Sequence, residues 1–348
     1  MSSEIIILIL WLTLILAGIS INSDRQLPFG LNQTAALRGI CAVEIMIGHI
    51  GIATGSIILF PNRKAGILFV GIFFILSGYG VAYSAEHKEG YMKYFLINRA
   101  VKLLLSAYTV KIIMLAIEKF LVGDIGGGIG TDNFLTGLNW YVWEQLLFYL
   151  VYWLAYKLLP SRVELCVGFF SGLFIILAYA GGMENPWYGS SLCFALGLYY
   201  YRYEKEKPSE KNSGGMGCFE GLKYYILLAM LLLVTGISIV LFFVLGNESV
   251  IGNPFARNIA SVSFGIAVIM LLYRVKIGNK TSCLLGRCSY EIFLVHPYMI
   301  FVMSKMAVKP NLLFGILVIV LSVLLACLIH LLMEKVLCWL QRGCKNML

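Results

Sequence analysis

Residues 65–83 read AGILFVGIFFILSGYGVAY and contain no charged side chain. A helix needs about 20 mostly apolar residues to cross roughly 30 Å of hydrocarbon, so this stretch is long enough to span a bilayer. Comparable apolar runs recur along the whole chain and are separated by short polar breaks. The sequence therefore predicts an all-α integral membrane protein whose spans pack as a single bundle.

The composition favours the same fold class. The 348 residues are 60% hydrophobic and 13% charged, with a mean hydropathy of +0.85, whereas soluble domains carry about 25% charged residues. We expect one domain over 1–348, with an extra N-terminal helix and linker at 1–31, a core at 32–333 and a cytoplasmic tail at 334–348. The apolar runs predict eleven spans: 5–21, 34–54, 65–83, 103–121, 138–158, 163–180, 187–201, 224–245, 255–273, 290–306 and 311–333.

Three segments allow another interpretation. The first span could be a signal peptide, but its only charge is Glu4 and Asn22-Ser23-Asp24 is not a small-x-small cleavage site. We therefore expect a retained helix there. The break around Lys309-Pro310 is either a turn or part of one re-entrant region. Residues 202–223 are rich in charge, Gly and Ser, which is typical of a flexible loop.

Charge asymmetry predicts the orientation in the membrane. Basic segments remain in the cytoplasm, and the segments after the odd-numbered spans are rich in Lys and Arg. We therefore expect a multi-pass plasma-membrane protein with its N-terminus outside and its C-terminus in the cytoplasm. Arg63-Lys64 departs from this rule. The net charge of +9 follows from the asymmetry and gives no support for nucleic-acid binding. The basic segments are 88–102, 157–162, 202–223, 274–287 and 335–345, and the opposite ones are 122–137, 181–186 and 246–254.

The nine cysteines predict neither a disulfide nor a metal site. None lies in a predicted outer loop, and most lie in or beside apolar spans, where Cys behaves as a small hydrophobe. Cys283 and Cys288 are not spaced as a CxxC pair, and no His cluster accompanies them.

Ionisable groups inside a bilayer are costly, so each is a candidate functional residue. Arg38 and His49 lie eleven residues apart in the second span. At about 100° and 1.5 Å per residue they point the same way, roughly 16 Å apart along the helix. Alone, Arg38 could be a snorkelling end residue and His49 a structural hydrogen-bonding group; on one stripe, a shared functional role is favoured. Glu44 points elsewhere and is expected to pair with another helix.

Other polar positions have both a functional and a structural interpretation. Ser77-Gly78 permits close helix packing, and Arg99 and Lys102 share a helix face that suits phosphates but also fits an ordinary cytoplasmic flank. Trp140 and Trp143 fit an aromatic belt. Glu144 and His296 either act directly or form structural hydrogen bonds, and His87 and His330 are interpreted as structural.

The order of these motifs resembles the acyltransferase-3 family of membrane O-acyltransferases, over roughly 32–333. The resemblance rests on Arg38 and His49, on Phe73-Phe74 with Ser77-Gly78, on Arg99 and Lys102, on the block from Trp140 to Tyr149, and on Ser289-Tyr290 with Leu294, His296 and Pro297. Lys102 replaces the second Arg of the family's basic pair, and the span at 5–21 is additional to a ten-helix core. A similar module forms the membrane half of membrane-bound serine racemases.

The resemblance implies transfer of an acyl group, usually acetyl from cytoplasmic acetyl-CoA, to a hydroxyl of an extracytoplasmic glycan, peptidoglycan or lipid-linked sugar. It places Arg38 and His49 at catalytic positions. Arg99, Lys102 and Ser77 are expected on the CoA side. Imidazole suits proton transfer from the hydroxyl near neutral pH, and His49 acts either as a general base or as an acyl carrier.

On the acceptor side, Trp140 and Trp143 can stack on a sugar, with Glu144 and His296 as further polar groups. The expected partners are acyl-CoA, the acceptor and membrane lipids, and no metal is expected. Two other function classes stay open at this point. One is a transporter or flippase, since intramembrane charges also mark substrate pathways. The other is a non-catalytic membrane sensor or partner module, and oligomerisation is not determined by the sequence.

Overall fold

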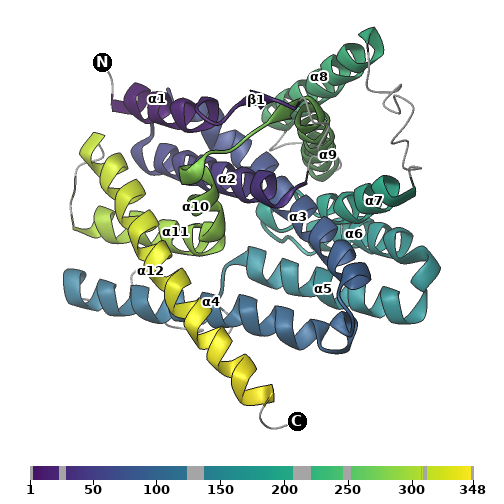
Figure 1. Ribbon diagram of the computed structural model, residues 1–348. Coiled ribbons are helices and arrows are strands. Elements are labelled where there is room, and N and C mark those ends of the chain that lie inside the picture. The colour runs from purple at the N-terminus through teal and green to yellow at the C-terminus, as the bar shows by residue number, and fades with distance from the viewer. Residues whose placement is uncertain are drawn as a thin grey trace.

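The computed structural model describes residues 3–22, 29–123, 137–206, 221–245, 252–306, 308 and 312–345. Within these ranges the chain forms helices joined by short connections (Figure 1). Two residue pairs, β1 (Ser20–Ile21) and β2 (Val275–Lys276), form a small antiparallel ribbon. The helices are α1 (Ser3–Leu16), α2 (Leu31–Thr54), α3 (Phe60–His87), α4 (Phe95–Val122), α5 (Trp140–Leu158), α6 (Val163–Ala180), α7 (Leu192–Glu206), α8 (Leu222–Leu245), α9 (Gly252–Arg274), α10 (Lys280–Arg287), α11 (Ser289–Lys305) and α12 (Leu312–Lys345), with 3₁₀ turns at Tyr91–Lys93, Pro160–Arg162 and Asn185–Trp187.

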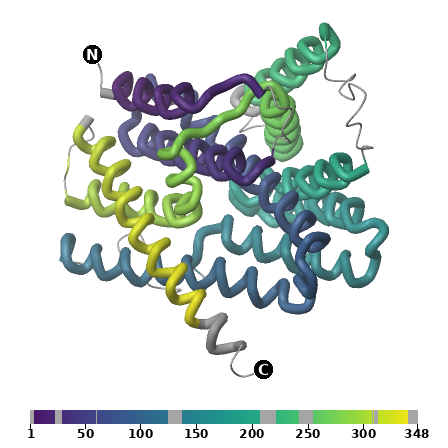
Figure 2. The backbone as a smooth tube through the Cα atoms, viewed as in Figure 1, coloured from purple at the N-terminus to yellow at the C-terminus, as the bar shows by residue number. Residues whose placement is uncertain are grey.

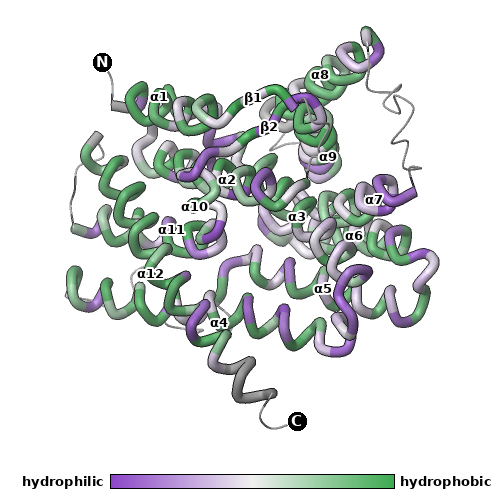
Figure 3. Tube along the Cα trace, in the orientation of Figure 1, coloured by the Kyte–Doolittle hydropathy of each residue, from purple (hydrophilic) through white to green (hydrophobic). Residues whose placement is uncertain are grey.

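The all-α membrane fold predicted from composition is confirmed. In the described part of the chain, seven helices are long and apolar enough to cross a bilayer, namely those of α2, α3, α4, α6, α8, α9 and α12. Figure 3 shows hydrophobic residues along most of these helices. Each of the other predicted spans also lies on a helix. These four, α1, α5, α7 and α11, have 14, 19, 15 and 17 residues, and α5 and α11 carry the predicted polar site residues.

The predicted span at 5–21 is wrong at its C-terminal end. Helix α1 ends at Leu16, and Ser20–Ile21 pairs with Val275–Lys276 instead. The backbone of Gly18 lies against that of Gly278, so closely that a Cβ on Gly18 would stand 2.6 Å from the Gly278 carbonyl carbon. The side chain of Asn22 donates to the carbonyls of Leu272 and Tyr273. The residues that make these contacts lie far apart in sequence, so local hydrophobicity did not predict the contacts.

Further boundaries differ from the sequence expectation. Helix α12 continues through Lys345, so the predicted tail at 334–348 is helical up to that residue. The predicted loop at 202–223 begins later, because α7 continues through Glu206, while 207–220 lie outside the described residues. Helix α10 was not predicted as a separate element; its start is fixed by a capping box between Asn279 and Ser282. The break around 309–310 also lies outside the described residues.

Helix α2 lies at the centre of the fold and packs against α3, α10 and α11 (Figures 1 and 2). Glycines make these contacts close. A Cβ on Gly39 would stand 2.2 Å from the carbonyl oxygen of Ser282 in α10, and one on Gly48 would stand 2.7 Å from that of Asn62 in α3. Small residues of this kind let membrane helices approach backbone to backbone. Because α2 is enclosed on several sides, any polar group that it carries must face a cavity or a partner.

Candidate active site

Two side chains on α2 are exposed within a stretch of the helix that is otherwise buried. From position 36 to position 51 every residue is buried except Arg38 and His49, which are exposed. Each of them lines a different cavity, named here the Arg38 cavity and the His49 cavity. The two residues that the sequence placed on one stripe are therefore the exposed residues of this buried stretch, and each lines one of the two cavities.

The Arg38 cavity has a volume of about 340 Å³ and is enclosed by α2, α3, α4, α5, α11 and α12, together with the end of α10. Its charge is predominantly positive, since four cationic side chains and one carboxylate, that of Glu291, line it. Pockets that hold small ligands usually have volumes of about 300–1,000 Å³. The cations that line the cavity are Arg38, Arg99, Lys102 and Arg287.

Backbone packing explains why Arg38 and Arg287 lie in the same cavity. Gly39 contacts the backbone of α10, and Gly286 contacts the backbone of α2, where a Cβ would stand 1.8 Å from the carbonyl oxygen of Ala35. Each glycine is the immediate neighbour of one of the two arginines. Only residues without a side chain permit this approach, so the glycines set the distance between the two charges.

Tyrosine side chains orient Arg99 and Ser77, two of the residues that were predicted for the CoA side. Arg99 donates two hydrogen bonds to the hydroxyl of Tyr91, at 3.0 and 2.6 Å, and its guanidinium lies 5.4 Å from the ring centroid of Tyr149. The hydroxyls of Ser77 and Tyr149 are hydrogen-bonded at 2.9 Å. Lys102 lines the same cavity. Meanwhile Gly78 packs on the carbonyl of Phe194, so the Ser-Gly pair contributes both to packing and to the cavity.

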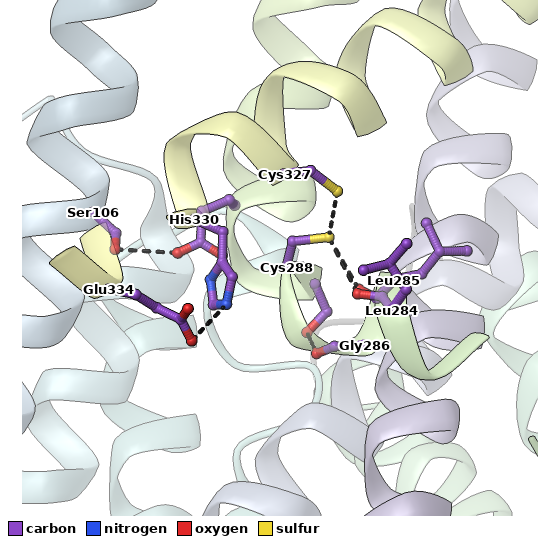
Figure 4. Close-up of polar contacts among 10 residues, drawn as sticks. Ser106, Leu284, Leu285, Gly286, Cys288, Cys327, His330 and Glu334 are labelled. Carbon is purple, nitrogen blue, oxygen red and sulfur yellow. Dashed lines mark hydrogen bonds and ion pairs between the residues drawn. The ribbon is translucent and has the colours of Figure 1, made fainter. Parts of the chain in front are cut away.

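His330 belongs to the Arg38 cavity, although its position on an apolar helix led to a structural interpretation. Its Nδ1 lies 3.3 Å from Glu291, and its Nε2 lies 3.4 Å from Glu334, which is exposed. Ser106 donates to Glu291 at 3.2 Å. Figure 4 shows Ser106, His330 and Glu334 gathered beside the thiol pair of Cys288 and Cys327, whose sulfurs lie 3.1 Å apart. A chain of ionisable groups thus connects the surface with the cavity wall.

The His49 cavity has a volume of about 290 Å³ and lies at the opposite end of the bundle. The opposition follows from chain direction: Arg38 precedes His49 on α2, whereas residues 62–67 at the start of α3 line this second cavity and Ser77, Gly80 and Ser84 line the first. The first residues of α5 and the 3₁₀ turn at Asn185–Trp187 also contribute to it. Its polar and charged lining residues are His49, Asn62, Arg63, Lys64, Asn139, Trp140, Arg257 and His296.

Two imidazole rings meet in this cavity. The ring centroids of His49 and His296 are 5.0 Å apart in an edge-to-face arrangement. Nδ1 of His296 lies 2.9 Å from the carbonyl oxygen of Ile292. A carbonyl can only accept, so Nδ1 carries the proton and Nε2 presents a lone pair. That Nε2 is buried and has no hydrogen-bond partner among the described residues. The pair is therefore suited to accept a proton from a ligand.

Phe293 separates the two cavities, because it lines both of them. Its ring centroid lies 5.0 Å from that of Tyr141, 6.4 Å from that of Phe73 and 6.0 Å from that of His296. Tyr141 and Phe73 line the Arg38 cavity, whereas His296 lines the other. Phe293 and the aromatic rings packed around it therefore lie where the two cavities meet.

The remaining predicted residues divide between the cavity and the core. Trp140 lines the His49 cavity, whereas Trp143 packs in the hydrophobic core. Glu144 is buried and accepts a 2.7 Å hydrogen bond from Ser191, which favours a structural role. The expectation that Glu44 pairs with another helix is confirmed, since both of its oxygens accept from Asn62 of α3.

Several cavity residues were not identified as site residues from sequence, namely Arg287, Arg257, Phe293, Tyr141 and His330. Arg287 is indistinguishable by position from the other cytoplasmic charges, and aromatic residues are frequent throughout the chain. The charge of Arg257 was a usable signal, since it lies inside a predicted span, where ionisable residues are rare.

Residues 34–331 match the model of the Acyl_transf_3 family, an acyltransferase domain. The match covers most of the chain, which therefore belongs to the acyltransferase-3 family and is a multi-pass membrane protein. No curated protein and no solved structure shows a significant match.

Proposed function

We propose that this protein transfers an acyl group, most simply acetyl, from cytoplasmic acyl-CoA to a hydroxyl of an extracytoplasmic glycan, cell-wall or lipid-linked acceptor. The observation that carries the proposal is the pair of cavities at opposite ends of the bundle, separated by Phe293 and its neighbouring rings. One cavity has the charge for a polyanionic donor, and the other has the bases for a hydroxyl acceptor.

The Arg38 cavity suits CoA because its four cations can neutralise the negative charge of the donor's phosphates. Hydrogen bonds between charged groups are stronger than neutral ones, and guanidinium groups match phosphate geometry. In this proposal Arg99, Lys102 and Arg287 hold phosphates. Arg38 polarises the thioester carbonyl, and the hydroxyl of Ser77 helps to position the pantetheine arm.

The His49 cavity supplies the proton acceptor. The hydroxyl oxygen of the acceptor attacks the thioester carbonyl carbon while its proton moves to an imidazole nitrogen. The carbon–sulfur bond then breaks, the acyl group stays on the acceptor oxygen, and the CoA thiolate takes up a proton. Nε2 of His296 has its lone pair free for this role among the described residues, with the His49 ring beside it. The transient acyl-imidazole route uses the same pair.

The aromatic partition must admit the thioester without opening a water path between the two sides. Rotation of the Phe293 ring, which packs edge-on or tilted against its neighbours, would join the cavities locally. Excluding water from this point would favour transfer to the acceptor over hydrolysis of the thioester.

Charge asymmetry supports an orientation of the two cavities relative to the membrane. Arg99, Lys102 and Arg287 lie in basic segments that the positive-inside rule places in the cytoplasm. The Arg38 cavity then faces the cytoplasm, where CoA is found, and the His49 cavity faces outward. This orientation also puts the C-terminal end of α12 in the cytoplasm.

Purified full-length protein tests the proposal. Wild type should bind acetyl-CoA and transfer radioactive acetyl to glycan-containing membranes of cells that lack the protein. Mass spectrometry of the products should locate acetyl esters on hydroxyls. A wild-type protein that neither binds acetyl-CoA nor consumes it would contradict the proposed function.

A further inference from the structure

We infer that Gln145 binds the acyl donor in the Arg38 cavity, where its side-chain Nε2 donates a hydrogen bond to a carbonyl of the pantetheine arm of CoA. The carbonyl is that of the amide nearer to the thioester. The inference rests on the proposed function, because it treats this cavity as the CoA site. It adds a contact to the neutral arm of the donor to the cations proposed for its phosphates.

Gln145 has an unpartnered donor at the wall of this cavity. Its side chain lines the Arg38 cavity, and the residue is only 1% exposed. Among the described residues that line the cavity, it alone has a buried side-chain polar atom without a hydrogen-bond partner, namely Nε2. A buried donor without an acceptor is costly. A ligand that brings a carbonyl oxygen to this point therefore gains a hydrogen bond that the protein alone does not make.

Two other buried side chains provide a contrast. Within the described ranges, Gln33 has no partner for either atom of its amide, and Glu144 has none for Oε2. Both residues are buried, and neither lines the Arg38 cavity or the His49 cavity. These groups are enclosed by protein, whereas Gln145 adjoins a cavity that is large enough for a ligand.

A tyrosine fixes the orientation of the Gln145 amide. The hydroxyl of Tyr141, one turn earlier on α5, donates to Oε1 of Gln145 at 3.3 Å. Oε1 is therefore engaged, and Nε2, which can only donate, is the atom left for a ligand. The matching group on the ligand is an acceptor such as an amide carbonyl oxygen.

Three side chains of α5 form a row along the Arg38 cavity at four-residue intervals. At one end, the ring centroid of Tyr141 lies 5.0 Å from that of Phe293. At the other end, the ring centroid of Tyr149 lies 5.4 Å from the guanidinium of Arg99. Gln145 lies between them, about 6 Å along the helix from each. The row therefore leads from the aromatic rings between the cavities to the cations proposed for the phosphates.

The pantetheine arm has an amide at the matching place. With the thioester at Phe293 and the phosphates at Arg99, the arm must pass Gln145. Two methylene groups separate the thioester sulfur from the nearer amide, which puts this amide beside the middle of the row. An amide carbonyl also accepts more strongly than a thioester carbonyl, because its nitrogen donates electron density to the oxygen. The nearer amide is therefore the group that fits Gln145.

A double-mutant cycle between protein and ligand tests this inference. Full-length wild type and Gln145→Met are titrated calorimetrically with CoA and with a CoA analogue in which two methylene groups replace the nearer amide. Methionine has a length similar to that of glutamine but no donor. The preference for CoA, which is the Kd of the analogue divided by the Kd of CoA, should fall about 3–10-fold in the variant, as expected for a neutral hydrogen bond.

Gln33→Met is the matched control, because Gln33 is also a buried glutamine but lines neither cavity. It should leave the preference for CoA unchanged, and thermal unfolding without ligand checks that both variants are folded. An unchanged preference in Gln145→Met, or an equal fall in Gln33→Met, would overturn the inference. Wild type that binds the analogue as tightly as CoA would overturn it whatever the stability of the variants.

Kinetics distinguish this contact from one with the reacting carbonyl. Gln145→Met should raise the KM for acetyl-CoA with kcat nearly unchanged, because a contact made equally in the ground state and the transition state contributes only to binding. A fall in kcat at unchanged CoA affinity would place the thioester at Gln145 and reject the amide contact.

The outcome is separable from that of the proposed function. Acetyl transfer by a protein whose CoA affinity does not depend on Gln145 would keep the enzyme assignment and reject this contact. CoA binding that depends on Gln145, in a protein that does not transfer acetyl groups, would keep the contact and reject the enzyme assignment.

Discussion

The Arg38 cavity and the His49 cavity share a helix but differ in chemistry. The first combines four cations with Glu291, His330 and several phenol hydroxyls. The second has two facing imidazoles, three cations and no carboxylate among the described residues. Positive charge alone therefore does not distinguish the two sides. The imidazole pair does, and in the proposed function it supplies the proton acceptor at one end of the bundle.

One helix, α2, contributes residues to both cavities. Arg38 and His49 are the exposed residues of an otherwise buried stretch of α2. Glycines beside each of them bring a different helix close, with Gly39 against α10 and Gly48 against α3. The proposed donor and acceptor sites are thus held by the same backbone, and Phe293 of α11 separates them.

The largest expected effect is on the imidazole side. His49→Gln and His296→Gln should each lower kcat by about 10²–10⁴-fold, because loss of a general base removes that much rate. Acetyl-CoA affinity should stay within about twofold, since the donor contacts lie beyond Phe293. Acetyl transfer and acetyl-CoA binding, measured on the same preparations, check both parts.

His87→Gln is the matched control, because His87 is exposed and lies outside both cavities. It should leave kcat unchanged. Near-normal transfer by both His49→Gln and His296→Gln would contradict the proposed role of the His49 cavity in proton transfer.

The next effect is on the cation side. Arg99→Gln combined with Lys102→Gln should weaken CoA binding by about 100-fold or more, because hydrogen bonds to charged groups contribute about 1.5–3 kcal/mol each. Added salt should weaken the wild-type affinity as screening grows. Equilibrium binding of CoA is the measurement.

Lys157→Gln with Arg162→Gln removes two exposed cations from the same end of the bundle. This control should bind CoA like wild type. If it loses as much affinity as the Arg99/Lys102 variant, general charge rather than the cavity governs binding.

A smaller effect is expected at the partition. Phe293→Ala should raise acetyl-CoA hydrolysis a few-fold in the absence of acceptor, because water from the His49 cavity would reach the thioester. Phe169→Ala, at an exposed phenylalanine on α6, is the control. A thiol-release assay without acceptor gives the result, and unchanged hydrolysis would argue that Phe293 is not the barrier.

The smallest effect concerns packing. Gly39→Ala should destabilise the protein by about 1–3 kcal/mol, the usual cost of overpacking, because its Cβ would stand 2.2 Å from a carbonyl oxygen. Gly172→Ala in α6 meets open space and should not be destabilising. Thermal unfolding in detergent compares them, and equal melting temperatures would contradict the close α2–α10 contact.

Sequence periodicity was sufficient for the helices and for part of the site. Apolar runs located eleven helices, and the spacing of Arg38 and His49 picked out the two exposed residues of the buried stretch 36–51 of α2. Both signals are local, because a helix repeats its geometry every few residues. The match of residues 34–331 confirms the predicted family.

What the sequence did not reveal depends on long-range packing. The His49–His296 pair joins α2 and α11, and the cation group at Lys64 and Arg257 joins α3 and α9. Neither pairing produces a periodic pattern that can be recognised in a single sequence. The contact between His330 and Glu291 was not predicted for the same reason, since the two residues lie on different helices.

A structure of the full-length His49→Gln protein with acetyl-CoA would show whether donor and acceptor use separate cavities. We expect CoA phosphates beside Arg99, Lys102 and Arg287, with the thioester reaching Phe293 and the His49 cavity open to an acceptor. CoA bound in the His49 cavity, or on the outer surface of the bundle, would contradict this expectation.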